Sequence, residues 1–471
     1  ALCYLSASFG CCFNPYIQWP DLSQIKNLLI GIIMDQSENQ FNQQLCAFLD
    51  ASPTPFHAVS SMVGLLSEAG FTELSDDQSW SLKKGGKYYV VRNGSSIVAF
   101  VNGSEAVSKA GVRIVGAHTD SPCPMLKPQP EMQKGGFSQL GVEIYGGALL
   151  NPWFDRDLSI AGRVVYKDAN QDLKQTLVNF KEPVATIPSL AIHLDRKANQ
   201  DRTINPQTDI PPILKLNLGN QKSQSFRQIL QQQFLTAKDQ VLDFELCLFD
   251  TQPAAMVGLE KEFLASGRLD NLLSCFVATQ ALIKADGTQT CIMACNDHEE
   301  VGSVSAVGAD GPFLESVIER IAANESSDLD ISAVMDKSLL ISCDNAHAVH
   351  PNYMDKHDAG HLPSINGGPV IKTNVKQRYA TNSVTSSRFK QLCEQANVPV
   401  QQFVSRADMG CGSTIGPIAS SRLGVATIDV GIPQLAMHSC RELTGSKDSL
   451  RLALVLGAFF DNTDPMGCDW V

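Results

Sequence analysis

The sequence predicts an α/β fold in which a β-rich segment interrupts the α/β part of the chain. Short apolar runs suited to buried strands, such as 112–116, 290–295 and 338–343, alternate with segments of helical periodicity. The stretch 121–256 differs from both of its flanks, because it holds strand-like pieces separated by Gly-Gly and proline punctuation.

Composition places the chain among globular proteins. It has 471 residues, 44% apolar and 18% charged, enough for one large or two ordinary domains. The formal net charge of -12 argues against nucleic acid or an anionic membrane as the main partner. The 14 cysteines are scattered without a C-x-x-C pair, which is typical of a reducing compartment. Since no secretory signal pattern is recognised, we expect a cytoplasmic protein.

The first 33 residues differ from the rest of the chain. They lack clear periodicity, and their apolar run 28–34 is far too short to span a bilayer. A helical pattern follows Met34 directly, so we expect the native chain to begin there. Residues 1–33 are then a non-native or disordered extension, and residues 34–120 form the first part of the catalytic domain.

The segment 121–256 is predicted to be an inserted β-rich domain, with 257–471 as the second part of the catalytic domain. Between 197 and 223 the insertion is polar and contains prolines, which indicates a long loop. His193, in the sequence SLAIHLD, lies inside the insertion. A half-buried strand position is the simpler interpretation of this histidine.

The most informative stretch is 290–301, which reads TCIMACNDHEEV. Its apolar first half suits a buried strand, and five polar residues then end in Glu299 and Glu300. Open α/β sheets place ligands and chemistry at the ends of their strands. At a metal site one carboxylate can bind the ion while its neighbour stays free as a base. Taken alone, however, such a pair is more often a solvated acidic loop.

A second polar group follows the strand predicted at 112–116. His118 and Asp120 are arranged as His-x-Asp, so the imidazole can bind a metal while the nearby carboxylate holds the ring. This short pattern is weak by itself, because a capping or surface histidine is the commoner explanation.

Three further ionisable residues punctuate the second half of the chain. Asp270 stands at the start of a helical pattern, where capping is an adequate explanation. Asp344 ends the strand predicted at 338–343, and His438 follows the strand predicted at 425–430. Together with the groups above, they supply two histidines and four carboxylates, as a pair of zinc ions requires, with cobalt or manganese as plausible substitutes. The set comprises His118, Asp270, Glu299, Glu300, Asp344 and His438.

Six motifs extend this set: VGAHTDSP, GRLDN, DHEEVGS, SCDNAHAVHPNY, GPVIKTNVKQRYATN and PQLAMHSCRE, in that order. In these motifs the chain resembles the aspartyl aminopeptidase family of dizinc metallopeptidases, which also includes yeast vacuolar aminopeptidase I. The resemblance covers roughly residues 40–460. It implies a mixed-sheet α/β/α dizinc exopeptidase domain interrupted by a β-rich dimerisation domain. It also implies self-association through that domain into a homododecamer that encloses the active sites.

The resemblance implies a ligand set for two zinc ions in each subunit. Asp270 would bridge both ions. His118 and Asp344 would complete one zinc site, and Glu300 and His438 would complete the other.

The resemblance also implies roles for residues that bind no metal. Glu299 would be the general base, taking a proton from the attacking water and passing it to the leaving amine. Asp120 would orient His118. His193 would enter the active site of a neighbouring subunit and help to stabilise the oxyanion.

An acidic substrate side chain needs a cationic or multi-donor pocket. By resemblance, Lys372 is the first candidate for pairing with the substrate carboxylate, and Tyr379 would lie near the carbonyl. His347 and Arg378 are further candidates, and a solvated loop is the alternative for all four residues, more so for Arg378 than for Lys372. Met409 departs from the polar loop of the family pattern, which weakens the expectation of strict acidic preference.

The sequence therefore predicts a zinc aminopeptidase that removes Asp or Glu from peptides with a free N-terminus. A neutral-residue aminopeptidase, a dizinc carboxypeptidase or another amide hydrolase is the alternative within the same chemistry. The motifs GPVIKTN and HAVHPNY favour the first interpretation over these. From a different class, the chain could be a catalytically silent shell-forming protein. The presence of Glu299 and of every expected ligand argues against that reading.

Overall fold

The computed structural model describes residues 22–217, 224–464 and 466. Among the helices of these residues, none combines the length and the apolar character that crossing a bilayer requires. The chain divides into two compact units, Ala1–Phe41 and Asn42–Val471.

The first unit contributes the beginning of helix α1 (Leu22–Ala51). Residues 22–33, part of the expected extension, are therefore helical. The remainder of that extension, residues 1–21, lies outside the described residues. The native start at Met34 stays a prediction.

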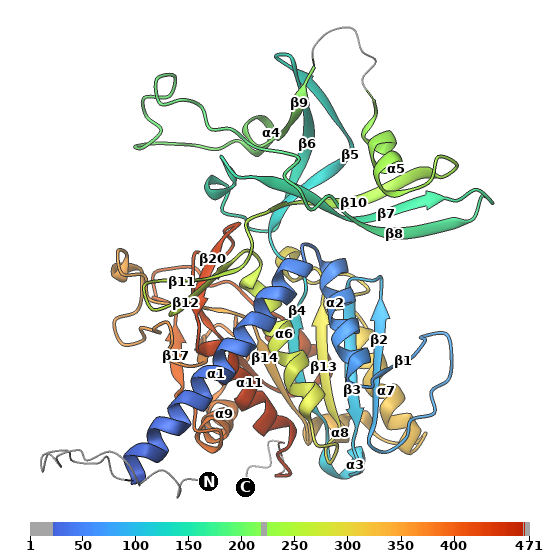
Figure 1. The fold of residues 1–471 in the computed structure, drawn as a ribbon. Helices are drawn as coiled ribbons and strands as arrows, with labels where there is room; N and C mark the ends of the chain where they lie inside the picture. The colour runs from blue at the N-terminus through green and yellow to red at the C-terminus, as the bar shows by residue number, and fades with distance from the viewer. Residues whose placement is uncertain (1–21, 218–223, 465, 467–471) are drawn as a thin grey trace, which may run out of the picture. The chain divides into compact units, whose positions relative to one another are not determined.

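A nine-stranded mixed sheet forms the framework of the second unit, in the order β1-β2-β3-β13-β4-β14-β18-β16-β17 (Figure 1). Its central strands β13, β4, β14 and β18 run parallel to one another. Every residue of β13, β4 and β14 is buried, because these apolar strands are covered on both faces. The strands are β1 (Thr72–Glu73), β2 (Gly86–Arg92), β3 (Ser96–Asn102), β4 (Arg113–His118), β13 (Cys291–Asn296), β14 (Leu339–Cys343), β16 (Val370–Thr373), β17 (Gln401–Val404) and β18 (Ala426–Gly431).

Helices cover both faces of this sheet, because alternate strand residues point to opposite sides. Ile292 of β13 packs in a core cluster with Phe313 of α7. Its neighbour Met293 faces α6, where the Thr279 hydroxyl donates to the Met293 sulfur at 3.2 Å. The helices after α1 are α2 (Pro55–Glu68), α3 (Val107–Ala110), α6 (Leu269–Lys284), α7 (Phe313–Glu325), α8 (Ile331–Asp336), α9 (Ser383–Gln395), α10 (Ile415–Leu423) and α11 (Asp448–Phe460). The predicted α/β/α layering is confirmed.

The second sheet has six strands in the order β8-β7-β10-β5-β6-β9, and all of its pairs are antiparallel (Figure 1). Its core includes Val142, Ile160 and Leu246, one from each of three of its strands. The elements are β5 (Cys123–Lys134), β6 (Phe137–Tyr145), β7 (Leu158–Lys167), β8 (Leu173–Asn179), β9 (Ile213–Leu216) and β10 (Gln240–Asp250), with helices α4 (Pro206–Asp209) and α5 (Phe226–Phe234). The β-rich character predicted for this part of the chain is confirmed.

A third, five-stranded sheet has the order β11-β12-β20-β19-β15. Its strands are β11 (Ala255–Val257), β12 (Phe263–Ser266), β15 (Ala346–His347), β19 (Pro433–Leu435) and β20 (Glu442–Gly445). The loop from β19 to β20 carries His438, so this small sheet delivers one of the candidate ligands.

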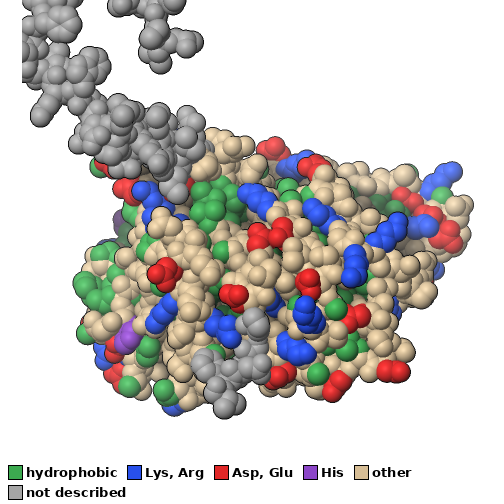
Figure 2. Space-filling view, turned by 90° about the horizontal axis from the view of Figure 1, so that it is seen from below, with side chains coloured by type: hydrophobic (Ala, Val, Ile, Leu, Met, Phe, Trp, Pro, Cys, Tyr) green, Lys and Arg blue, Asp and Glu red, His purple; other side chains and the backbone are tan. Residues whose placement is uncertain are grey.

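Figure 2 shows Lys and Arg side chains interspersed with Asp and Glu on one face of the molecule. This face differs from the single-signed surfaces with which proteins bind nucleic acids.

Candidate active site

Three neighbouring parallel strands end at one edge of the nine-stranded sheet, and a candidate residue follows each of them. His118 is the last residue of β4 and pairs in register with Asn296, the last residue of β13. Glu299 and Glu300 begin the short 3₁₀ helix η2 (Glu299–Val301) just after β13. Asp344 directly follows β14. The carboxyl ends of parallel strands therefore gather these side chains at one place.

Two further candidates come from outside these strands. Asp270 lies in the first turn of α6, where its backbone φ and ψ are not helical. His438 lies in the loop between β19 and β20. The structure brings both of them to the strand ends. Three overlapping groups have ligand atoms within 4.8 Å of one another: His118 with Glu299 and Glu300, His118 with Asp270 and Asp344, and Asp270 with Glu300 and His438.

Asp270 stands at the centre of these groups. Its Oδ1 lies 3.5 Å from His118 Nε2, and its Oδ2 lies 3.5 Å from His438 Nε2. Around His118, Asp344 Oδ1 is 3.9 Å from the same Nε2. Around His438, Glu300 Oε1 is 3.3 Å from its Nε2. The donors thus divide into two sets that share one carboxylate.

Each histidine has its other ring nitrogen engaged. His118 Nδ1 lies 3.1 Å from the Asp120 carbonyl oxygen and 3.4 Å from Asp120 Oδ1. His438 Nδ1 lies 3.1 Å from the carbonyl oxygen of Gly147. An imidazole that donates from Nδ1 presents the lone pair of Nε2, which is how metal-binding histidines are usually oriented. In both residues that Nε2 faces the shared Asp270.

Two buried oxygens in the cluster accept no hydrogen bond within the described part of the chain. They are Asp270 Oδ1 and Glu300 Oε1. Buried carboxylate oxygens without a partner are costly, so this arrangement calls for a cation. Imidazole nitrogens with carboxylate oxygens are donors that zinc accepts. The residues present therefore fit a zinc centre.

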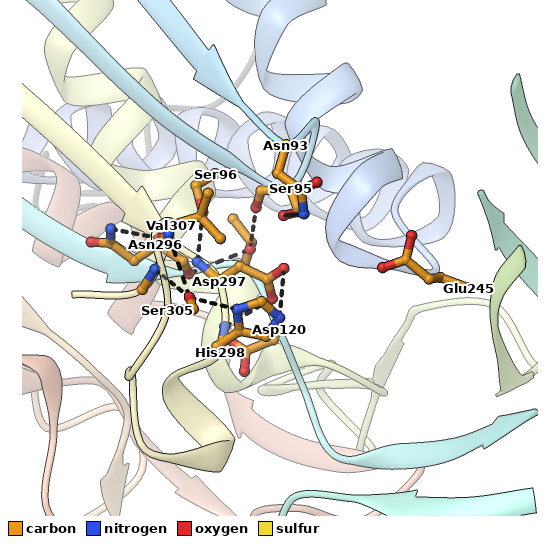
Figure 3. A network of polar contacts seen from close by, with 12 residues as sticks. Asn93, Ser95, Ser96, Asp120, Glu245, Asn296, Asp297, His298, Ser305 and Val307 are labelled. Carbon is orange, nitrogen blue, oxygen red and sulfur yellow. Dashed lines mark hydrogen bonds and ion pairs between the residues drawn. The ribbon is translucent and has the colours of Figure 1, made fainter. Parts of the chain in front are cut away.

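A polar network holds the loop that carries the glutamate pair (Figure 3). The backbone N–H of Asp297 donates to Ser96 Oγ at 2.8 Å, and that of His298 donates to Asp297 Oδ1 at 2.8 Å. His298 Nδ1 lies 2.9 Å from Ser305 Oγ, which closes the loop on its far side. Burial, followed by the charge of Asp120, raises the pKa of Asp297 to about 6. This network fixes the direction in which the pair leaves β13.

Glu442 is a buried site residue that sequence reasoning missed. Its Oε2 accepts from the backbone N–H of Asp270 at 3.0 Å, and its Oε1 accepts from that of His438 at 2.7 Å. Burial, followed by the charge of Asp270, raises the pKa of Glu442 to about 8. The only signal in the sequence is its place four residues after His438 in the last motif. One side chain thus ties together the backbones of two candidate ligands.

We expect Glu442→Ala to lower both the zinc affinity and kcat, each by about 10–100-fold. Loss of a contact behind a metal ligand typically has an effect of this size. The change removes the acceptor of two buried N–H groups and loosens both ligands. Zinc competition with a chromogenic chelator, together with steady-state kinetics, measures both losses. Glu394→Ala, on the exposed side of α9, is the control. Unchanged zinc affinity in Glu442→Ala would contradict the assignment.

A cavity of about 320 Å³ is lined by the substrate-binding candidates His347 and Tyr379 and by Met409. His347 opens to this cavity, and both the protein packed around its ring and the charge of Lys372 lower its pKa. The other lining residues are Ala348, His350, Lys356, His357, Phe403, Val404, Ser405, Arg406, Gly410, Cys411, Gly412, Gln434, Leu435, Ala436 and Met437.

Lys372 is placed differently from those three residues. It is 2% exposed and does not line the cavity. Its Nζ lies 3.3 Å from Asp344 Oδ2 and donates to the carbonyl oxygen of Asn345 at 3.3 Å. The same ammonium lies 5.1 Å from the ring centre of Tyr379, which does line the cavity. Lys372 therefore stands between a candidate ligand and the wall of the cavity.

Two other candidates lie apart from the metal-ligating groups of the described chain. Arg378 is exposed. His193 is exposed in a turn of the β-rich part, rather than half-buried in a strand as the simpler interpretation had it. Within one subunit, His193 is not a member of any of the three groups.

Comparison with known proteins gives consistent matches. Residues 48–460 match a family model described as "Aminopeptidase I zinc metalloprotease (M18)". A protein of Stutzerimonas stutzeri, named "Probable M18 family aminopeptidase 2", is 55% identical over 431 residues, covering 90% of this chain and 99% of its own. The protein of the same name from Azotobacter vinelandii is 53% identical over 427 residues, covering 90% of this chain and 98% of its own.

Solved structures agree with these matches. A chain of the Ape4 and Nbr1 complex, solved by cryo-EM, has a TM-score of 0.86 at 39% identity, over 90% of this chain and 86% of its own. The crystal structure of prApe1 has a TM-score of 0.85 at 30% identity, and the match covers 90% of this chain and 98% of that one. The mApe1 dodecamer of S. cerevisiae has a TM-score of 0.78 at 31% identity, and the match covers 90% of this chain and 97% of that one.

Proposed function

The chain belongs to the M18 family of zinc aminopeptidases, and from this premise we propose that it holds two zinc ions and removes N-terminal Asp or Glu from peptides. The observation that carries the acidic preference is the lining of the cavity. It includes three histidines, a lysine and an arginine, and no aspartate or glutamate. In a chain of net charge -12, such a cavity favours an anionic side chain.

Two zinc ions fit the division of donors around Asp270. His118 and Asp344 would hold one ion, Glu300 and His438 the other, and Asp270 both, in line with its two oxygens facing different histidines. When bound, zinc polarises a scissile carbonyl and makes water more acidic. Asp120 and Gly147 keep each imidazole turned with Nε2 toward the carboxylates.

Glu299 is the proposed general base, which accepts a proton from the attacking water and gives it to the leaving amine. Its backbone N–H donates to Asp120 Oδ1 at 3.2 Å, which fixes the position of the residue beside the cluster. Burial raises the pKa of its carboxyl to about 8, with His118 opposing the shift. A raised pKa makes the carboxylate a stronger proton acceptor.

Lys372 remains our proposed partner for the substrate carboxylate, supported by its position behind Tyr379. Lys356 and Arg406 also line this cavity, although each has a carboxylate beside it, Asp355 at 3.8 Å from Lys356 and Asp408 at 2.6 Å from Arg406. A neutral-residue aminopeptidase is the second candidate. The apolar lining residues Phe403, Met409 and Leu435 favour it.

Turnover of Asp-, Glu- and Leu-linked peptides before and after chelation, with zinc re-addition, tests the proposal. We expect chelator-sensitive cleavage that favours Asp or Glu. Lys372→Met should reduce this preference by about 10–100-fold, the worth of a hydrogen bond to a charged group, with Lys376→Met as the exposed control. Preference for Leu would reject the acidic specificity but keep the metal centre, and zinc analysis of Lys372→Met separates lost selectivity from lost metal.

We also propose that the inserted part 121–256 mediates assembly into a homododecamer. Apolar side chains flank His193, where Ile192 is 45% and Leu194 is 76% exposed. In this assembly His193 would reach a neighbouring active site. A relative of the chain is described as a dodecamer. Mass photometry reports the assembly directly, and an assembled but inactive protein would instead support a silent shell.

A further inference from the structure

One segment that follows a strand of the six-stranded sheet lies against the metal-ligating cluster. This segment, residues 145–149, begins at Tyr145, the last residue of β6. We call it the β6 strap. It makes direct hydrogen bonds to residues of the candidate site at two separate places.

The first place is Asp120. The Tyr145 hydroxyl donates to Asp120 Oδ2 at 2.7 Å, and Asp120 itself is 1% exposed. The same carboxylate accepts the backbone N–H groups of Glu299 at 3.2 Å and Glu300 at 3.0 Å. Its Oδ1 also lies 3.4 Å from His118 Nδ1. Asp120 therefore holds one histidine and the glutamate turn at once, and Tyr145 holds Asp120.

The second place is His438. Its Nδ1 lies 3.1 Å from the Gly147 carbonyl oxygen, and the Leu149 backbone N–H donates to the His438 carbonyl oxygen at 3.0 Å. Between these contacts, Gly146 has a φ of +67°, and a Cβ there would lie 3.1 Å from Glu300 Cβ. The strap thus lies against His438 and Glu300 as well, so it touches the surroundings of both proposed zinc positions.

We infer that Tyr145 is a positioning residue of the metal centre, through which the inserted β-rich sheet sets the geometry of His118 and of the Glu299–Glu300 turn. The hydroxyl fixes the carboxylate of Asp120 in the one orientation that serves all three partners. Without it, Asp120 Oδ2 keeps only the backbone N–H of Glu300 as a donor, so the carboxylate is held less firmly. This inference rests on the metal centre of the proposed function.

The test is Tyr145→Phe, which keeps the ring and removes the hydroxyl. We expect zinc affinity to fall by about 10–100-fold, as for other contacts behind metal ligands. At saturating zinc we expect kcat to remain about 10-fold lower with KM within 2-fold, because the glutamate turn is loosened. Tyr166→Phe is the matched control, since Tyr166 lies on β7 in the same sheet and pairs there with Lys174 and Val241. It should keep wild-type zinc affinity and kcat.

A double-mutant cycle with Asp120→Asn distinguishes positioning from a general loss of stability. If Tyr145 acts through Asp120, adding Tyr145→Phe to Asp120→Asn changes zinc affinity by less than 2-fold. Additive effects would overturn the inference, as would wild-type zinc affinity in folded Tyr145→Phe. Should Tyr145→Phe fail to fold, the zinc affinity of Asp120→Asn decides: a loss of about 10–100-fold supports the inference, and affinity near wild type overturns it.

Failure of the inference and failure of the proposed centre give different results. If His118→Ala retains both zinc ions, the ligand assignment itself is wrong. If His118→Ala loses zinc while Tyr145→Phe binds it normally, the centre stands and only the role of the β6 strap falls.

Discussion

Glu299→Gln is expected to lower kcat by about 10²–10⁴-fold, the usual contribution of a positioned general base. The amide keeps the shape of the side chain and the backbone hydrogen bond to Asp120, but it cannot accept the proton. KM should change by less than a few-fold, because the loss falls on the chemical step. Steady-state kinetics with an Asp-linked substrate measure both constants, and metal analysis should still give two zinc ions per subunit.

The matched control is Glu319→Gln, the same chemical change on an exposed position of α7. It should retain wild-type kcat and KM. A Glu299→Gln enzyme with near wild-type kcat would remove Glu299 from the role of base. A variant that loses zinc as well would place Glu299 among the metal ligands instead. This alternative is meaningful because Glu299 forms one of the three metal-ligating groups with His118 and Glu300.

Asp270→Ala is expected to have the largest effect on metal content, because Asp270 faces both histidines of the cluster. Removing it takes one donor from each proposed zinc position. Zinc bound after dialysis should fall from the proposed two ions per subunit to fewer than one. Activity should fall by more than about 100-fold, the upper range seen when only an indirect contact to zinc is lost. Elemental analysis and kinetics check the two results.

Asp336→Ala, which removes an exposed carboxylate from the end of α8, controls for the change in net charge. A variant Asp270→Ala that keeps one tightly bound zinc would show that Asp270 serves a single ion. Retention of two would contradict the bridging role entirely.

The sequence predicted the central sheet well, because β4, β13 and β14 are short, apolar and buried on both faces. The polar residues that directly follow such an apolar run mark the end of the strand in the sequence. His118 and Asp344 are therefore visible as candidates in the sequence, and the structure brings them together.

Other parts of the site depend on contacts that no local pattern encodes. Glu442 meets the backbone of Asp270 across 172 positions of the chain, and Tyr145 reaches Asp120 from a different sheet. Lys372 is a candidate in the sequence only by resemblance, and no pattern there shows that it is almost fully buried beside Asp344. These relations arise only from tertiary packing, so periodicity and spacing could not reveal them.

The donors of the candidate centre lie between His118 and His438, and thus far apart along the chain. During synthesis, the strand ends that carry the first donors emerge long before the loop between β19 and β20. A nascent chain therefore lacks the complete set until almost all of it has been made. Because metal binding at such a set also contributes to folding free energy, zinc would stabilise the fold only at a late stage of folding. Its uptake would mark the completion of the fold rather than guide its early steps.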